Sequence, residues 1–213
     1  MRRFFSIHMH GMQFLMNVLL FSLAGLVPVL LIYVLLSPGF ASTLIAGGPP
    51  LSRFLRQVLT NGLPVVFVTN YVGFFLYALS QEIPTSNRDP ALYLLADPPT
   101  RVAIFLILHA LIYMLSADWF GSFGGSRITA LGVVAPTLAR SALFENISGV
   151  YLYATMVSAI PLYVSAIAHS PRLSRTVAIF PFKLGTLIIG LAWFFLAALC
   201  LTVAAEVIIK IHV

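Results

Sequence analysis

Long apolar runs place the strongest limit on what this chain can fold into. Residues 14–36 contain no charged side chain, and a transmembrane helix needs about 20 mainly apolar residues. Charged residues make up 8% of the 213 residues, whereas a soluble domain carries about 25%. The sequence therefore predicts an all-α, polytopic integral membrane protein.

The apolar runs predict about five membrane helices, within a range of about four to six. We expect one integral membrane domain over residues 1–213. The polar residues 80–100 are expected to form a solvent-facing loop, with Arg101 at the start of the next span. The expected spans lie at about residues 14–36, 63–79, 102–117, 127–168 and 176–209, and a short helix in the interface plane lies at about 51–59.

Two of these segments are longer than an upright span requires. Residues 127–168 would form a helix of about 60 Å, twice the hydrocarbon thickness of about 30 Å. Either this helix is strongly tilted, or it breaks near Glu145 and Asn146 into a half-span and a full span. Residues 176–209 would extend about 50 Å. The sequence predicts that the chain ends in a long, tilted helix hairpin.

Arg140 is the charge most deeply embedded in apolar sequence. An arginine at mid-membrane costs at least about 2.5–3.5 kcal/mol on insertion scales. It therefore needs an internal partner, a water-filled cavity, or a position from which its side chain reaches the headgroups. His109 lies within an expected span and is either a functional residue or a neutral ring bonded to a neighbouring helix.

The sequence lacks the motifs of a self-contained enzyme, such as HExxH, GxSxG or a Walker lysine. A lone cysteine excludes a disulfide framework within one chain, and the 12 basic residues are scattered rather than clustered. We therefore expect no cofactor, no metal site and no nucleic-acid partner. The sequence favours a conduit or an assembly subunit over a self-contained enzyme. At most, the chain would be the proton-translocating subunit of a larger enzyme.

Three stretches carry a family resemblance: PTLAR at residues 136–140, LFENISG at 143–149 and LIIGLAW at 187–193. With the order of elements, they resemble subunit a of the F-type rotary ATP synthases. The chain departs from that family in two ways. Asn146 follows Arg140 by six positions, whereas the interval in the family is four positions. The glutamine of the family's terminal helix has no counterpart here.

The resemblance implies a proton-conducting stator subunit in which Arg140 separates two aqueous half-channels. It also implies a c-ring partner and an energy-coupling membrane, either the mitochondrial inner membrane or the bacterial plasma membrane. The candidate residues of the proton path are Arg140, Glu145, Asn146, Tyr151, His109 and Glu206.

Two alternatives remain. The loop Phe123-Gly124-Gly125 resembles that of the small Yip1-type proteins, which implies a membrane-organising role. The chain could instead be a small transporter or a non-catalytic accessory subunit of another membrane complex. Its partners would then be other membrane subunits and lipids.

Overall fold

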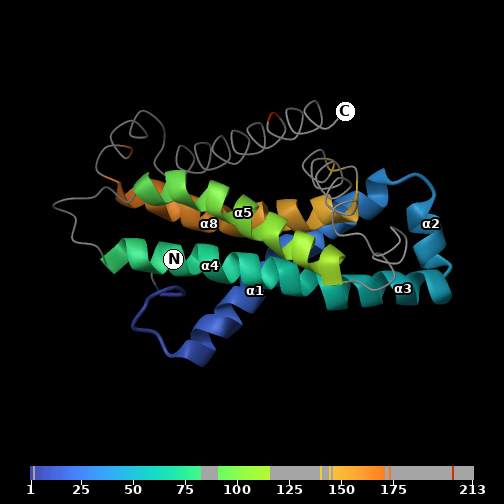
Figure 1. Cartoon of the computed structure of the whole chain (residues 1–213), viewed down its shortest axis with the longest axis horizontal. Coiled ribbons are helices and arrows are strands. Elements are labelled where there is room, and N and C mark those ends of the chain that lie inside the picture. The colour runs from blue at the N-terminus through green and yellow to red at the C-terminus, as the bar shows by residue number, and fades with distance from the viewer. Residues whose placement is uncertain are drawn as a thin grey trace.

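The computed structural model describes residues 1, 3–82, 91–115, 140, 144, 146–170, 173 and 203. Their regular secondary structure is entirely helical (Figure 1), so the all-α prediction is confirmed for this part of the chain. The elements are α1 (Gly11–Leu36), α2 (Phe40–Ile45), α3 (Pro49–Gln57), the π-helical turn η1 (Val58–Gly62), α4 (Leu63–Glu82), α5 (Ala91–Leu115) and α8 (Ile147–His169).

Within the described part of the chain, three helical segments are long and apolar enough to cross a membrane: Gly11–Leu36, Pro49–Glu82 and Ile147–His169. This agrees with the expected integral membrane protein. The expected count of spans stays a prediction, and so does the terminal hairpin, because all of residues 176–209 except Val203 lie outside the described residues.

Helices α4 and α8 form the centre of a four-helix bundle. They pack against each other, and α1 and α5 each pack against both of them (Figure 1). Gly25 allows α1 to approach α8 closely, since a Cβ atom there would lie 2.6 Å from the carbonyl oxygen of Ala154. Small residues at such crossings are typical of membrane helix pairs.

The bundle has two apolar clusters with polar side chains between them. The first cluster includes Leu26, Val66 and Phe105 and lies toward the α3 end. The second includes Phe74 and Leu162 and lies toward the opposite end. The candidate site lies between these two clusters.

Helix α3 continues into α4 instead of forming the separate short helix expected at residues 51–59. The residues that flank η1, Gln57 and Leu63, both have right-handed helical backbone angles. The Asn61-Gly62 pair, which resembles a turn in sequence, is absorbed into the π turn. A helical segment of 34 residues therefore runs from Pro49 to Glu82.

The expectation of a solvent-facing loop over residues 80–100 was wrong for residues 80–82, which end α4, and for residues 91–100. Residues 83–90 lie outside the described residues. Helix α5 starts at Ala91 and continues through Pro98 and Pro99. Each proline removes a backbone donor from the helix. The Thr100 hydroxyl donates to the Ala96 carbonyl at 2.7 Å, and the ion pair described below links the turns on either side of the prolines.

The expected helix over residues 127–168 is interrupted at Phe144 and Asn146, and residues 127–139, 141–143 and 145 lie outside the described residues. Phe144 has a positive φ of 61°, and Asn146 is extended, with φ −139° and ψ 168°. Helix α8 begins only at Ile147, where the Asn146 side chain accepts a hydrogen bond from the Gly149 amide at 3.0 Å. Of the two alternatives for this segment, the break near Asn146 is the one observed.

Candidate functional site

An ion pair on α5 lies at the centre of the site. Asp97 and Arg101 stand one helical turn apart, and Arg101 Nε donates to Asp97 Oδ2 at 2.6 Å. Both side chains have no exposed area. A buried pair of this kind stabilises the fold only when further hydrogen bonds complete it, and here the neighbouring helices supply them.

Arg101 connects α5 to the other three helices of the bundle. Its Nη1 donates to Asn70 Oδ1 on α4 at 2.5 Å and to the Thr155 carbonyl on α8 at 3.0 Å. Asn70 in turn donates to the Ser22 hydroxyl on α1 at 2.9 Å. Every helix of the bundle therefore contributes to one hydrogen-bonded group, which we call the central network: Ser22, Asn70, Asp97, Arg101, Thr155 and Tyr163.

The central network lies near the middle of the bundle. At 1.5 Å per residue, Ser22 is about 16 Å from the start of α1 and about 21 Å from its end. A bilayer core is about 30 Å thick. If α1 crosses a membrane, the ion pair therefore lies deep in the hydrocarbon region, where ionisable side chains mark functional sites by default.

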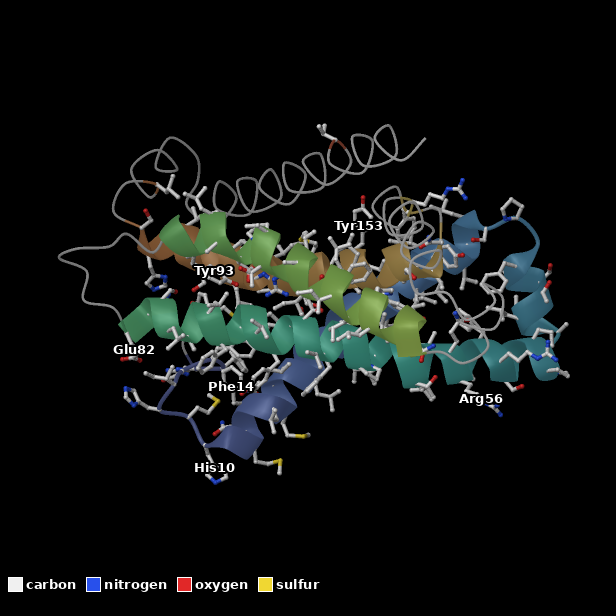
Figure 2. The ribbon with its side chains drawn as sticks, in the orientation of Figure 1. His10, Phe14, Arg56, Glu82, Tyr93 and Tyr153 are labelled. Atoms are coloured by element: carbon white, nitrogen blue, oxygen red, sulfur yellow. The ribbon has the colours of Figure 1, made fainter. Side chains whose placement is uncertain are left out.

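Tyrosines lie on the side of the network that faces the start of α5. The Tyr163 hydroxyl donates to Asp97 Oδ2 at 2.5 Å. The ring of Tyr93 lies 6.0 Å from that of Tyr163 and 5.3 Å from that of Tyr77, centroid to centroid; Tyr93 is labelled on α5 in Figure 2. Tyr77 shares a hydrogen bond of 2.8 Å with Ser165. Polar groups thus extend from Asp97 toward the end of the bundle that holds Glu82.

Two atoms of the ion pair have no hydrogen-bond partner among the residues that the structure describes. They are Asp97 Oδ1 and Arg101 Nη2, both buried. They lie beside Gly73 of α4, where an added Cβ would be 2.6 Å from Asp97 Oδ1. The Arg101 guanidinium also lies 5.1 Å above the ring of Phe74, within the range of a cation–π contact. One carboxylate oxygen therefore remains available to accept a proton.

A cavity of about 180 Å³ lies on the other side of the network. Its lining includes His109 of α5, the N-cap residue Asn146, and Ser148 and Tyr151 of α8. His109 and Tyr151 are buried, with exposed fractions of 4% and 2%, and His109 shares a hydrogen bond of 3.1 Å with the Phe105 carbonyl. This cavity brings polar side chains into the apolar end of the bundle.

Phe105 separates the cavity from the ion pair along α5. Asp97, Arg101, Phe105 and His109 follow one another at intervals of four residues, so each side chain lies one turn from the next along the helix. The Phe105 side chain is fully buried, and its ring centroid lies 4.0 Å from that of His109. The polar track along the bundle is interrupted at this ring.

The structure brings together half of the residues expected on a proton path. Asn146, Tyr151 and His109 line the same cavity. Arg140 is exposed, whereas Glu145 and Glu206 lie outside the described residues. The candidate site therefore does not depend on any of these three.

Sequence reasoning missed the ion pair. Residues 80–100 are rich in proline and polar residues, a composition that predicts a loop and so places Asp97 in solvent. The available signal was the spacing of four residues between Asp97 and Arg101, which brings opposite charges together on a helix.

No protein-family model, curated protein or solved structure matches the chain. Its function must therefore be argued from the site itself. Nowhere in the described residues do three His, Cys, Asp or Glu side chains gather as a metal ion would require. What the site offers is a buried carboxylate, a fixed cation beside it and hydroxyl and imidazole groups on either side, which is a set suited to proton transfer.

Proposed function

We propose that this protein conducts protons across its membrane, with Asp97 as the mid-membrane proton carrier and Arg101 as the charge that excludes other cations. The observation that carries the proposal is the fully buried Asp97–Arg101 pair. Tyrosine side chains approach the pair from the Glu82 end of the bundle. On the other side, the ring of Phe105 separates it from the polar cavity, so a proton passes to that side only when this ring moves. Chains of acidic, histidine and hydroxyl groups inside membrane proteins are typical of proton relays.

The transfer is a binding and release of one proton at Asp97. The open oxygen, Oδ1, accepts the proton, and the carboxylate becomes a neutral carboxylic acid. This weakens its attraction to Arg101, whose positive charge then rests on Asn70 and the Thr155 carbonyl. Loss of the proton toward the other side restores the ion pair. The positive guanidinium meanwhile opposes the passage of a free cation.

The proposal keeps the proton conduction expected from the sequence and assigns the central arginine role to Arg101. A stator role for Arg140 and a c-ring partner stay predictions that rest on the sequence resemblance alone. Neither is needed for the test below.

The test is proton flux in liposomes that contain the purified protein and a pH-sensitive dye. With a potassium gradient and valinomycin, the native protein should acidify or alkalinise the lumen faster than empty liposomes do. Asp97→Asn should lower this flux at least about tenfold. Glu82→Gln, which changes an exposed carboxyl group at the end of α4, should leave it unchanged. Native flux in Asp97→Asn, or no flux from the native protein, would overturn the proposal.

A second pair of variants separates conduction from folding. Removing one partner of a buried ion pair costs about 3–5 kcal/mol, because the other charge is left alone, whereas removing both can be nearly neutral. The double variant Asp97→Asn/Arg101→Gln should therefore melt at a higher temperature than Asp97→Asn and still conduct no protons. Tyr163→Phe, which keeps the ring but removes the hydroxyl, should slow the flux.

One observation favours an accessory or assembly role as the second candidate. The central network links α1, α4, α5 and α8, so the same contacts can serve to fix the bundle. That role predicts a native protein without proton flux, and an Asp97→Asn variant whose defect is lost thermal stability or lost association with partner subunits.

A further inference from the structure

A second cavity opens where α1, α2, α3 and α8 meet. Its volume is about 450 Å³, and it adjoins the smaller cavity, with which it shares Gln57, Asn146 and Ile147. It lies at the end of the bundle, beside the last turn of α1 and the first residue of α8. If these helices cross a membrane, the cavity lies at the level of the lipid headgroups.

Aromatic rings form one wall of this cavity. Phe40 of α2 packs against Tyr33 of α1 at 6.1 Å and against Phe54 of α3 at 5.4 Å, with interplanar angles of 74° and 85°. Edge-to-face contacts of this kind hold the rings in place. Tyrosine is enriched where membrane proteins meet the headgroups, and the two phenylalanine rings beside Tyr33 are apolar, so the wall suits an amphipathic ligand.

Of the lining residues that the structure describes, one is charged, and its charge is positive. Arg53 of α3 lines the cavity with Gln57 and Asn146, and no Asp or Glu is among the lining residues that the structure describes. An arginine guanidinium presents donors in a planar fork that matches the oxygens of a phosphate group. The cavity therefore favours an anion with hydrogen-bond acceptors.

Two of the elements that line the cavity, α1 and α2, each end in an exposed apolar side chain. Leu36, three residues beyond Tyr33, is 70% exposed, and Ile45 at the end of α2 is 86% exposed. Exposed apolar side chains at the ends of these two helices match a ligand with hydrocarbon chains. We propose that the cavity binds the phosphate headgroup of an anionic phospholipid, with Arg53 on the phosphate and the acyl chains along Leu36 and Ile45.

Arg56 provides a matched control for Arg53. Both arginines are exposed and belong to α3, but Arg56 does not line the cavity. In Figure 2 its side chain points away from the bundle. Arg53→Gln and Arg56→Gln therefore remove the same charge from the same helix, and only the first removes it from the cavity.

The experiment measures binding of phosphatidylglycerol to the detergent-purified, full-length protein by native mass spectrometry. A hydrogen bond between charged partners is worth enough that its loss should weaken binding about tenfold or more. We expect this loss in Arg53→Gln and less than about a twofold change in Arg56→Gln. Equal effects in the two variants would overturn the proposal, since the attraction would then be a general one of surface charge.

Two further arms test the choice of ligand. Phosphatidylcholine, whose headgroup has no net charge, should bind more weakly than phosphatidylglycerol. Inorganic phosphate at millimolar concentration should not displace the lipid. Equal binding of the two lipids would overturn the proposed preference for an anionic headgroup. Displacement by phosphate would overturn the choice of a lipid, because the cavity would then bind the free ion.

Discussion

At the scale of single residues, Gly73 controls how closely α4 approaches the ion pair. Its missing side chain leaves room for Asp97 Oδ1 and the Arg101 guanidinium. Gly73→Ala places a methyl group 2.6 Å from that carboxylate oxygen, so the pair or the helix must move. Overpacking of this kind costs about 1–3 kcal/mol, and we expect that loss in the free energy of unfolding in detergent and SDS mixtures.

The control for this prediction is Gly11→Ala, because no atom lies within 4 Å of a Cβ at Gly11. This variant should unfold like the native protein. If Gly73→Ala has the same free energy of unfolding as Gly11→Ala, the ion pair does not pack closely against α4 at Gly73.

The contrast between Arg101 and Arg140 shows what the sequence could predict of the site. Arg140 stands out in sequence because its neighbours are apolar, yet it is exposed. Arg101 follows a polar stretch and is completely buried. Its burial depends on Asn70 and the Thr155 carbonyl, which are 31 and 54 residues away and which no local pattern connects to it.

At the scale of elements, Asn146 fixes where α8 begins. Its side chain caps the Gly149 amide, and its own extended backbone ends the preceding segment. Loss of such a cap costs about 1 kcal/mol on average. Asn146→Ala should lower the free energy of unfolding by about that amount. Asn146→Asp keeps an oxygen acceptor at a good capping residue and should stay close to the native value; an equal loss in both variants would argue against the cap.

Element prediction succeeded where apolar residues dominate and failed where tertiary contacts override local signals. The apolar run at residues 14–36 is α1, which begins three residues earlier. The paired prolines 98 and 99 indicate a loop, but α5 passes through them. In isolation the two lost donors would disfavour a helix; in the bundle, the ion pair and its partners on α4 and α8 stabilise it.

At the scale of the whole molecule, the central network explains why these four helices form one bundle. Its hydrogen bonds join α1 to α4, α4 to α5 and α5 to α8. In lipid, apolar surfaces alone give little preference for one helix neighbour over another. Buried polar groups do give such a preference, because each must lie at the same depth as its hydrogen-bond partner on the neighbouring helix. The central network therefore fixes how the helices are aligned along the bundle axis as well as which helices are neighbours.

The arrangement also predicts which parts of the chain share a side of the membrane. His8 lies 3.4 Å from Glu82, so the segment before α1 and the end of α4 lie at the same end of the bundle. Arg56 lies at the opposite end of the α3–α4 segment (Figure 2). That segment has 34 residues, about 50 Å at 1.5 Å per residue, which exceeds the hydrocarbon thickness of about 30 Å.

Cysteine labelling in sealed vesicles tests this topology. The lone native cysteine, Cys200, is first replaced by serine, and His10→Cys, Glu82→Cys and Arg56→Cys are then made one at a time. A membrane-impermeant maleimide should label the first two variants from the same side. Arg56→Cys should react only from the other side, because the helix that joins it to Glu82 must cross the hydrocarbon core. Labelling of all three from one side would mean that Pro49–Glu82 does not span the membrane, and the ion pair would then not lie at its middle.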